Sequence, residues 1–159
     1  MHIGGDMAQH EVGIDATDLK ILRELEKDGR ISFRTIADKL KISDGTVRSR
    51  VNRMMEEGLL KIAPLIDPFC FKNSLIANIG MQLESRTHLE TMNKLAELDG
   101  VLNVCNTAGA YDLFVEVFLE SREELNRFLF EVLPHIGGIK NTHTWVYLDG
   151  RNKWIEAKL

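Results

Sequence analysis

The chain has 159 residues, of which 44% are hydrophobic and 28% are charged. This ordinary composition argues against a wholly disordered chain. No apolar run reaches the roughly 20 residues of a membrane span, and the first residues lack the basic and then apolar pattern of a signal peptide. The only cysteines, Cys70 and Cys105, lie far apart, which argues against a disulfide scaffold. We therefore expect a cytoplasmic protein without membrane contact.

The net charge is −4, with 24 acidic and 20 basic residues, which excludes a protein that is basic over its whole surface. Residues 30–53 are different, because they hold seven basic and two acidic side chains. The segments on either side, 1–29 and 65–159, are both acidic overall. The basic segment is either a solvated helix surface or a binding surface for nucleic acid.

Residues 1–13 show no periodicity and predict a flexible tail. Three short helices are expected next, because Asp15, Ser32 and Ser43 each precede apolar residues at a spacing of three and four. Glycines at the C′ position, Gly29 and Gly58, end the first and third helices.

Apolar residues alternate after the third helix and predict a strand over Leu60, Ile62 and Leu65. Three helices and a strand are typical of a winged-helix-like domain, which we place at residues 14–64. Prolines then predict a linker over residues 64–73.

The remaining residues, 65–159, predict the order β-α-β-β-α-β. Alternating apolar residues indicate strands over 76–83, 101–107, 113–119 and 139–148. Capping boxes at Thr87/Glu90 and Ser121/Glu124 indicate the two helices. This order predicts a ferredoxin-like domain with two helices on one face of a four-stranded antiparallel sheet, so the fold class of the whole chain is α+β.

Large apolar residues are also expected on the face of this sheet that no helix covers. They are Phe114, Phe118, Trp145 and Tyr147 or the residues that alternate with them, because both alternating sets in the strands hold large apolar side chains. A sheet that is apolar on both faces needs a partner, so we expect a homodimer through this face.

The segment Arg34–Met55 has the helix, short turn and second helix of a DNA-binding motif. With Val47, Val51 and Met54 directed inward, the outward residues are small, polar or cationic and suit base edges and phosphates. The alternative is a generic three-helix bundle with a solvated basic surface. We expect double-stranded DNA to contact Ser43, Asp44, Gly45, Thr46, Arg48, Ser49, Asn52 and Arg53.

Three segments carry a family resemblance: IDATDLKILRELEKDGRIS, IADKLKISDGTVRSRVNRMMEEGLL and TAGAYDLFVEV. They are similar to the leucine-responsive/asparagine-responsive (Lrp/AsnC) transcription regulators over residues 14 to about 150. The resemblance implies an N-terminal DNA-binding domain and a C-terminal domain for amino-acid sensing, with dimers that assemble into higher oligomers. One position departs from the family, because Lys41 stands in the turn where glycine is common.

The segment Thr107–Asp112 contains glycine and aspartate and by itself predicts only a turn. The resemblance implies more, because in these regulators a loop of this type helps to bind the effector amino acid. Backbone amides there can hold a carboxylate, and Asp112 can hold an ammonium group. The expected effector-binding residues are Gly109, Ala110, Tyr111, Asp112, Thr142 and Thr144.

No catalytic residue, metal site or cofactor is predicted. The histidines lack metal-ligand spacing, and no phosphate-binding or nucleophile motif is present. Two alternatives to a regulator remain. An Lrp-like enzyme such as a sirohaem decarboxylase subunit would need histidine in the central strand GAYDLFVEV, which has none. The second alternative is a module that only binds a ligand and assembles. The basic helix argues against it, because such a module needs no basic surface for DNA.

Overall fold

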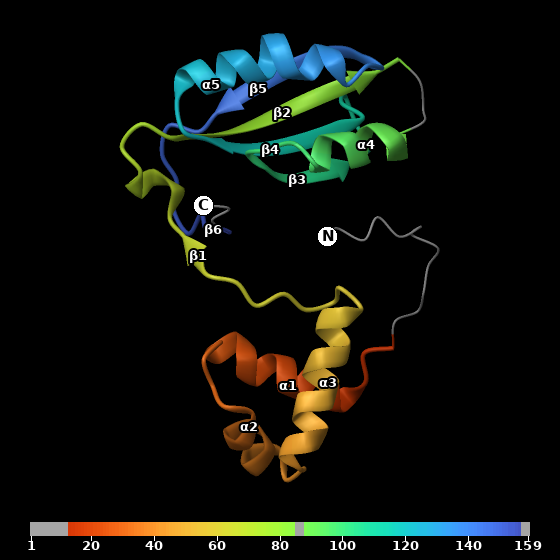
Figure 1. Ribbon diagram of the computed structural model, residues 1–159, viewed down its shortest axis with the longest axis vertical. Coiled ribbons are helices and arrows are strands. Elements are labelled where there is room, and N and C mark those ends of the chain that lie inside the picture. The colour runs from red at the N-terminus through yellow and green to blue at the C-terminus, as the bar shows by residue number, and fades with distance from the viewer. Residues whose placement is uncertain (1–12, 85–87, 157–159) are drawn as a thin grey trace. The chain divides into compact units, whose positions relative to one another are not determined.

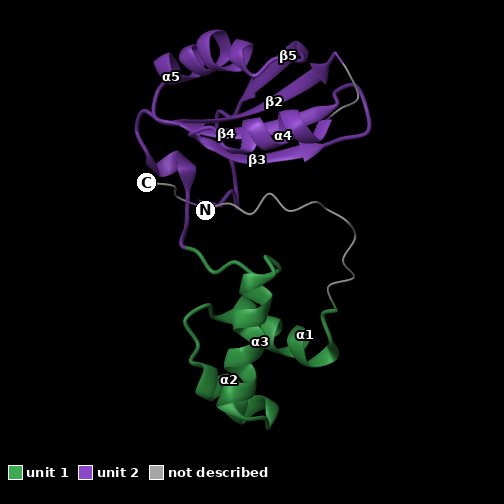
Figure 2. Cartoon of the chain, turned by 45° about the vertical axis from the view of Figure 1, so that its right-hand side comes forward, with its two compact units in different colours: residues 1–63 green, residues 64–159 purple. Residues whose placement is uncertain are grey.

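The computed structural model describes residues 13–84 and 88–156. The chain divides into two compact units, residues 1–63 and residues 64–159 (Figure 2). The tail predicted over residues 1–13 lies outside the described residues, apart from Gly13. None of the described helices is both long and apolar enough to cross a membrane.

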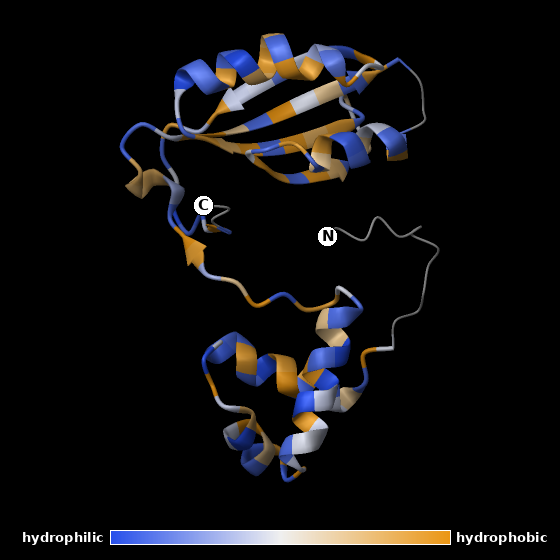
Figure 3. Ribbon diagram, in the orientation of Figure 1, coloured by the Kyte–Doolittle hydropathy of each residue, from blue (hydrophilic) through white to orange (hydrophobic). Residues whose placement is uncertain are grey.

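Unit 1 consists of three helices, α1 (Ala16–Lys27), α2 (Phe33–Leu40) and α3 (Asp44–Glu56) (Figure 1). Each is amphipathic, and the apolar sides form one core (Figure 3). The buried core residues are Ile21, Leu25, Ile36, Ala37, Val47, Val51 and Met54. The inward positions predicted for α3 are therefore confirmed.

The predicted helix starts are confirmed at all three positions. Asp15 caps α1 and forms a capping box with Asp18, whereas the hydroxyls of Ser32 and Ser43 accept hydrogen bonds from backbone N–H groups in α2 and α3. Lys41 ends α2 in the left-handed conformation, with φ 56° and ψ 45°. The turn thus has the geometry that glycine adopts most readily, with a lysine in its place.

The strand predicted over Leu60, Ile62 and Leu65 is wrong. Residues 60–64 form no strand, and the backbone N–H groups of Leu59 and Leu60 both donate to the carbonyl of Met54. A two-residue strand, β1 (Leu65–Ile66), belongs to unit 2, where it pairs with β6 (Ile155–Glu156). Alternation over so few residues does not determine a pairing partner, and β6 was not predicted at all.

Unit 2 has the predicted β-α-β-β-α-β order. Its sheet contains β2 (Leu75–Leu83), β3 (Val101–Asn106), β4 (Leu113–Leu119) and β5 (Ile139–Val146), and all neighbouring pairs are antiparallel. The strand order β3-β4-β2-β5 is that of a ferredoxin-like sheet. Helices α4 (His88–Ala96) and α5 (Arg122–Arg127) pack on one face over a core that includes Ile79, Met81, Leu95 and Val115.

The two predicted capping boxes of unit 2 differ from the expectation. Thr87 lies outside the described residues. The Ser121 hydroxyl accepts a hydrogen bond from the Glu124 N–H as predicted, but the Glu124 carboxylate accepts from the Glu120 N–H, one residue earlier than in a capping box. After α5 the chain continues as a π-helical turn (Phe128–Val132) and a 3-10 turn (Leu133–His135).

The second sheet face carries aromatic residues, as predicted, but segments of the same chain cover part of it. Phe71 packs edge-on against Phe118, with ring centroids 5.8 Å apart. The Lys153 ammonium group reaches Glu116 on β4 at 2.7 Å. Trp145 remains 39% exposed. The face left for a partner is therefore smaller than the sequence implies.

Candidate nucleic-acid interface and the 107–112 loop

The predicted contact surface lies along α3 and its N-terminus. Ser43 and Thr46 are engaged in the helix cap, where the Ser43 hydroxyl accepts from the Thr46 N–H at 3.0 Å and lies 2.8 Å from the Thr46 hydroxyl. Three predicted contact residues one turn apart, Gly45, Ser49 and Asn52, are exposed along the same side of α3. The structure thus forms the polar helix side that the sequence predicted.

Gly45 is not required by the fold of unit 1. A Cβ atom at this position would meet no atom closer than the Ser43 hydroxyl oxygen, at 3.8 Å. Glycine weakens a helix interior by roughly 0.5–1 kcal/mol relative to alanine. A glycine without an internal reason, near the start of an exposed helix, fits a site where another molecule approaches the backbone closely.

Arg48 is the most exposed arginine of the predicted surface, with 60% of its side chain accessible. Its guanidinium lies 3.3 Å from the Asp44 carboxylate and 5.3 Å from the ring centroid of Phe33. An exposed ion pair between residues i and i+4 contributes only about 0.3–0.5 kcal/mol. Arg48 therefore gives up little when it turns toward an external anion.

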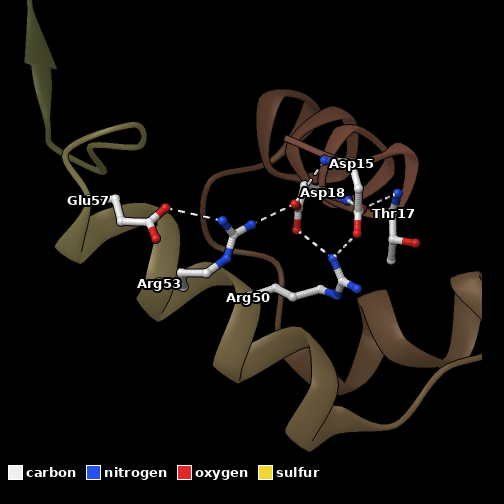
Figure 4. A network of polar contacts seen from close by, with 6 residues as sticks. All are labelled: Asp15, Thr17, Asp18, Arg50, Arg53 and Glu57. Atoms are coloured by element: carbon white, nitrogen blue, oxygen red, sulfur yellow. Dashed lines mark hydrogen bonds and ion pairs between the residues drawn. The ribbon is translucent and has the colours of Figure 1, made fainter. Parts of the chain in front are cut away.

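Arg53 is placed differently, because it points to the start of α1. Its Nη2 donates to Asp18 at 2.6 Å and its Nη1 donates to Glu57 at 3.1 Å. Arg50, which was not among the predicted contact residues, donates from one nitrogen to both Asp15 and Asp18 (Figure 4). We call this group of five residues, Asp15, Asp18, Arg50, Arg53 and Glu57, the α1–α3 clamp.

Asp18 is the centre of the clamp and is fully buried. Burial by itself raises the pKa of its carboxyl, but hydrogen bonds from Arg50 and from the Asp15 backbone outweigh that effect, so the pKa lies below its ordinary value. The pKa of Asp15 is also lowered, by the Asp18 backbone N–H and then by Arg50. Both carboxyls are therefore ionised at neutral pH. Their negative charges compensate the positive charges of Arg50 and Arg53, which the charge count of residues 30–53 includes as excess positive charge.

A further carboxylate of α1 acts on the basic segment in the same way. Glu24 binds Lys27 and Lys39, and these two ammonium groups lower its pKa to about 2. Within residues 13–84 and 88–156, no carboxylate lies within ion-pair distance of Arg30, Arg34 or Lys41. The excess positive charge of residues 30–53 is thus concentrated on these three side chains.

An open groove runs between the start of α1 and α3. It contains predicted contact residues together with both arginines of the clamp. Its lining residues are Gly13, Asp15, Ser43, Gly45, Thr46, Ser49, Arg50 and Arg53. The sequence shows Arg50 and Arg53 three residues apart, and Asp15 and Asp18 three residues apart. It does not show that these arginines contact these aspartates.

The 107–112 loop is closed by its own hydrogen bonds. The Thr107 N–H donates to the Asp112 carbonyl at 2.9 Å, and the Thr107 hydroxyl donates to the Tyr111 carbonyl at 2.7 Å. The Asp112 carboxylate accepts from the Leu83 N–H at 2.8 Å, which ties the loop to the end of β2. Gly109 has φ 159°, close to extended backbone, and no atom lies within 4 Å of a Cβ built there.

The predicted effector residues lie on two sides of the sheet. Tyr111 packs over Gly80 on the face without helices, against Phe114 and Trp145. Thr142 and Thr144 are paired with the core residues Met81 and Ile79 and so face the helix side. Ala110 contributes its carbonyl to the Gln82 side chain at 2.9 Å. Their role in effector binding stays a prediction.

No described group of three or more His, Cys, Asp or Glu side chains is arranged to hold a metal ion. The described residues thus form two candidate sites. One is the helix-turn-helix surface with its hydrogen-bond donors, carboxylates and arginines, and the other is the 107–112 loop beside the antiparallel sheet.

A helix-turn-helix followed by a ferredoxin-like unit defines a class of DNA-binding regulators, and the comparisons identify the family. Residues 14–61 match the model of a winged helix-turn-helix DNA-binding domain, and residues 76–152 match the Lrp/AsnC ligand-binding domain. An uncharacterized HTH-type transcriptional regulator of Pyrococcus horikoshii is 35% identical over 150 residues, which cover 94% of each chain. An HTH-type transcriptional regulator of Methanocaldococcus jannaschii is 38% identical over 133 residues, covering 81% of this chain and 90% of that protein. The chain belongs to the Lrp/AsnC family of transcriptional regulators.

Solved structures agree with this assignment. AsnC of Escherichia coli is 27% identical, with a TM-score of 0.68 over 87% of this chain and 94% of that one. The leucine response regulatory protein of Mycobacterium tuberculosis has a TM-score of 0.77 at 21% identity, over 88% of this chain and 96% of that one, and shows the same fold. A Neisseria meningitidis regulator solved in complex with L-Met has a TM-score of 0.68 at 19% identity, over 86% of this chain and 91% of that one.

The clamp predicts a specific acid response of unit 1. A carboxyl with a lowered pKa in the folded state stabilises the fold above its unfolded pKa, near 4, and loses that contribution as the pH falls through the folded value. We expect the helical circular dichroism of the wild type to melt at steadily lower temperature as the pH falls below about 4.5. In Asp18→Asn the free energy of unfolding at pH 7 falls by about 1–3 kcal/mol, and the further loss in acid is smaller.

Both tryptophans and both tyrosines lie in unit 2, so their fluorescence gives an internal control for the same samples. The Asp18→Asn variant could also lose as much stability between pH 4.5 and pH 2 as the wild type. That result would show that the Asp18 carboxylate is not the cause of the acid sensitivity.

Gly45 yields a second prediction with opposite signs for stability and binding. Gly45→Ala should raise the free energy of unfolding by at most about 1 kcal/mol, because the added methyl group is free of clashes and favours the helix, of which Gly45 is the second residue. The same variant should bind DNA more weakly if Gly45 is a contact residue as predicted, because the methyl group would then stand between the DNA and the backbone. Melting curves and DNA titrations of one preparation measure both effects, and unchanged DNA affinity would mean that Gly45 is not at the interface.

Proposed function

We propose that this chain is a sequence-specific DNA-binding transcriptional regulator whose assembly or DNA binding responds to a small effector, an amino acid. The observation that carries the DNA-binding part is the exposed polar side of α3, with Gly45, Ser49 and Asn52 one turn apart. A helix of this kind fits the major groove, where hydrogen-bonding side chains reach base edges. The other proposed contacts are Ser43, Asp44, Thr46 and Arg48, whereas Arg53, which the sequence also predicted as a contact, is bound to Asp18 and Glu57.

The family consists of transcriptional regulators, and we propose no catalytic activity for this chain. β4, the strand that would carry histidine in the enzyme alternative, reads LFVEVFL. A protein that only binds and stores a ligand would not need the exposed cations of unit 1, which supports regulation over storage.

The effector part of the proposal rests on unit 2. Its sequence matches a ligand-binding domain, and the Neisseria regulator of the same fold was solved with an amino acid. We propose that backbone groups near Gly109 and Ala110 and the carboxylate of Asp112 bind the two ends of a free amino acid. Tyr111 belongs to the same loop, whereas Thr142 and Thr144, which face the helix side of the sheet, are proposed as separate contacts. The partners are thus double-stranded DNA, an amino acid and further copies of the chain.

The homodimer is proposed through the sheet face opposite the helices. Trp145 is exposed there, and its ring packs against those of Tyr111, Phe114 and His143, with centroids 5.5, 5.8 and 4.4 Å away. A second copy that covers this cluster would bury the exposed indole in an isologous contact, from which larger assemblies are built.

DNA binding is tested with a duplex that the wild-type protein selects from a random pool. We expect enrichment of one sequence, and a log–log dependence of affinity on salt between about 50 and 200 mM. Arg48→Ala should reduce the slope by about 0.9, because one phosphate contact is lost. A pool without enrichment, or a slope that is unaffected by Arg48→Ala, would contradict this assignment.

The effector site is tested by a thermal-shift screen of the twenty amino acids. A ligand at 100 times its dissociation constant stabilises the protein by about 2.7 kcal/mol. Asp112→Asn is the informative variant, because an asparagine oxygen still accepts from the Leu83 N–H while the charge that would bind an ammonium group is gone. We expect Asp112→Asn to fold normally and to lose the shift. A full shift in this variant would mean that Asp112 only ties the loop to β2.

The dimer is tested by light scattering at micromolar concentration. We expect a fragment of residues 65–159 to be dimeric and a fragment of residues 1–64 to be monomeric, because the exposed aromatic cluster lies in unit 2. Trp145→Glu in the whole chain should weaken the dimer, because it places a charge in the contact. A monomeric 65–159 fragment that keeps its circular dichroism would refute the proposed interface.

A further inference from the structure

Two arginines of α3 are already bound to carboxylates within unit 1. We infer that Arg50 and Arg53 are positioning residues, which fix α3 against α1 for base reading, and that the phosphate contacts of this unit are made by Arg34, Lys41 and Arg48. This inference rests on the proposed DNA binding and assigns separate roles to cations that the sequence groups together.

The geometry of the clamp favours positioning. Asp18 is fully buried and accepts hydrogen bonds from three groups: the Asp15 N–H at 3.1 Å, Arg50 at 2.9 Å and Arg53 at 2.6 Å. Arg53 also holds Glu57 at the end of α3 (Figure 4). One guanidinium thus joins the first turn of α1 to the last turn of α3, and the orientation of α3 depends on it.

The charge of the clamp leads to the same conclusion. Two arginines face three carboxylates, those of Asp15, Asp18 and Glu57, so the clamp has no excess positive charge. A DNA phosphate that captured Arg53 would leave the carboxylate of Asp18 buried beside Arg50 alone. Because an incompletely paired buried carboxylate is strongly unfavourable, the internal partner holds Arg53 against exchange.

Arg34, Lys41 and Arg48 have no such restraint. Within the described part of the chain Arg34 and Lys41 have no carboxylate partner, and both are exposed, on α2 and in the turn that follows it. Arg48 has an exposed ion pair of 3.3 Å with Asp44 and lies 5.3 Å from the ring centroid of Phe33. These side chains reach a phosphate without loss of a buried interaction, and each releases counterions when it does so.

The salt dependence of DNA binding separates the two roles. Affinities are measured for the selected duplex and for an unrelated duplex of equal length, at salt concentrations between about 50 and 200 mM. For Arg53→Ala and Arg53→Lys we expect at least a tenfold loss of affinity for the selected duplex, an unchanged log–log slope and a smaller ratio between the two duplexes. Arg48→Ala is the matched control and should lower the slope by about 0.9 on both duplexes.

Arg53→Lys is the variant that best separates a positioning role from a phosphate contact. It also keeps the test possible if Arg53→Ala does not fold. Lysine keeps the charge and binds phosphate, but it lacks the planar fork that reaches Asp18 and Glu57 together. Wild-type affinity in Arg53→Lys, or a slope reduced by about 0.9 in Arg53→Ala, would overturn the inference. Circular dichroism confirms that each variant is folded. A wild-type protein without salt-dependent DNA binding would instead refute the proposed function itself.

Discussion

The arrangement of unit 1 depends on one buried carboxylate. Asp18 lies on α1, a helix that contributes no predicted DNA contact, yet it binds two arginines of α3 and accepts a hydrogen bond that closes the cap of its own helix. The hydrophobic effect that holds the three helices together is non-directional, whereas hydrogen bonds to a buried charge are directional. The contacts of Asp18 with Arg50 and Arg53 thus help to fix the orientation of α3 relative to α1, in addition to the apolar packing that holds the two helices together.

A single carboxylate also fixes the 107–112 loop of unit 2. Asp112 ties the loop to the end of β2, while Tyr111 fills the space above Gly80 together with Trp145. A Cβ atom at residue 80 would lie 2.8 Å from the Tyr111 ring, so the close approach requires glycine. The loop proposed for the effector and the sheet face proposed for the dimer therefore share the contact between Tyr111 and Trp145.

Much of the fold follows from the sequence, since its local rules act within a few residues. Helix caps at Asp15, Ser32 and Ser43 and the alternation in β2 and β4 are properties of neighbouring positions, and these features were predicted correctly. The strand expected after Gly58 and the unpredicted β6 depend on pairing between residues about 90 positions apart. Two-residue strands carry too little pattern for that distance to be inferred.

The candidate site shows the same limit. The residue types and the exposed side of α3 follow from a helical period, but the partners of Arg50 and Arg53 depend on how α1 crosses α3. Counting charges gave a basic segment at residues 30–53, whereas the structure shows that Asp15, Asp18 and Glu24 balance much of it. Which cations remain available to DNA is therefore a property of the tertiary structure.

A crystal structure of the protein bound to its selected duplex tests the central claim most directly. The account predicts α3 in the major groove, with Arg53 still bonded to the buried Asp18 and with Arg48 at a phosphate. A complex in which Arg53 has left Asp18 and contacts a phosphate would contradict it.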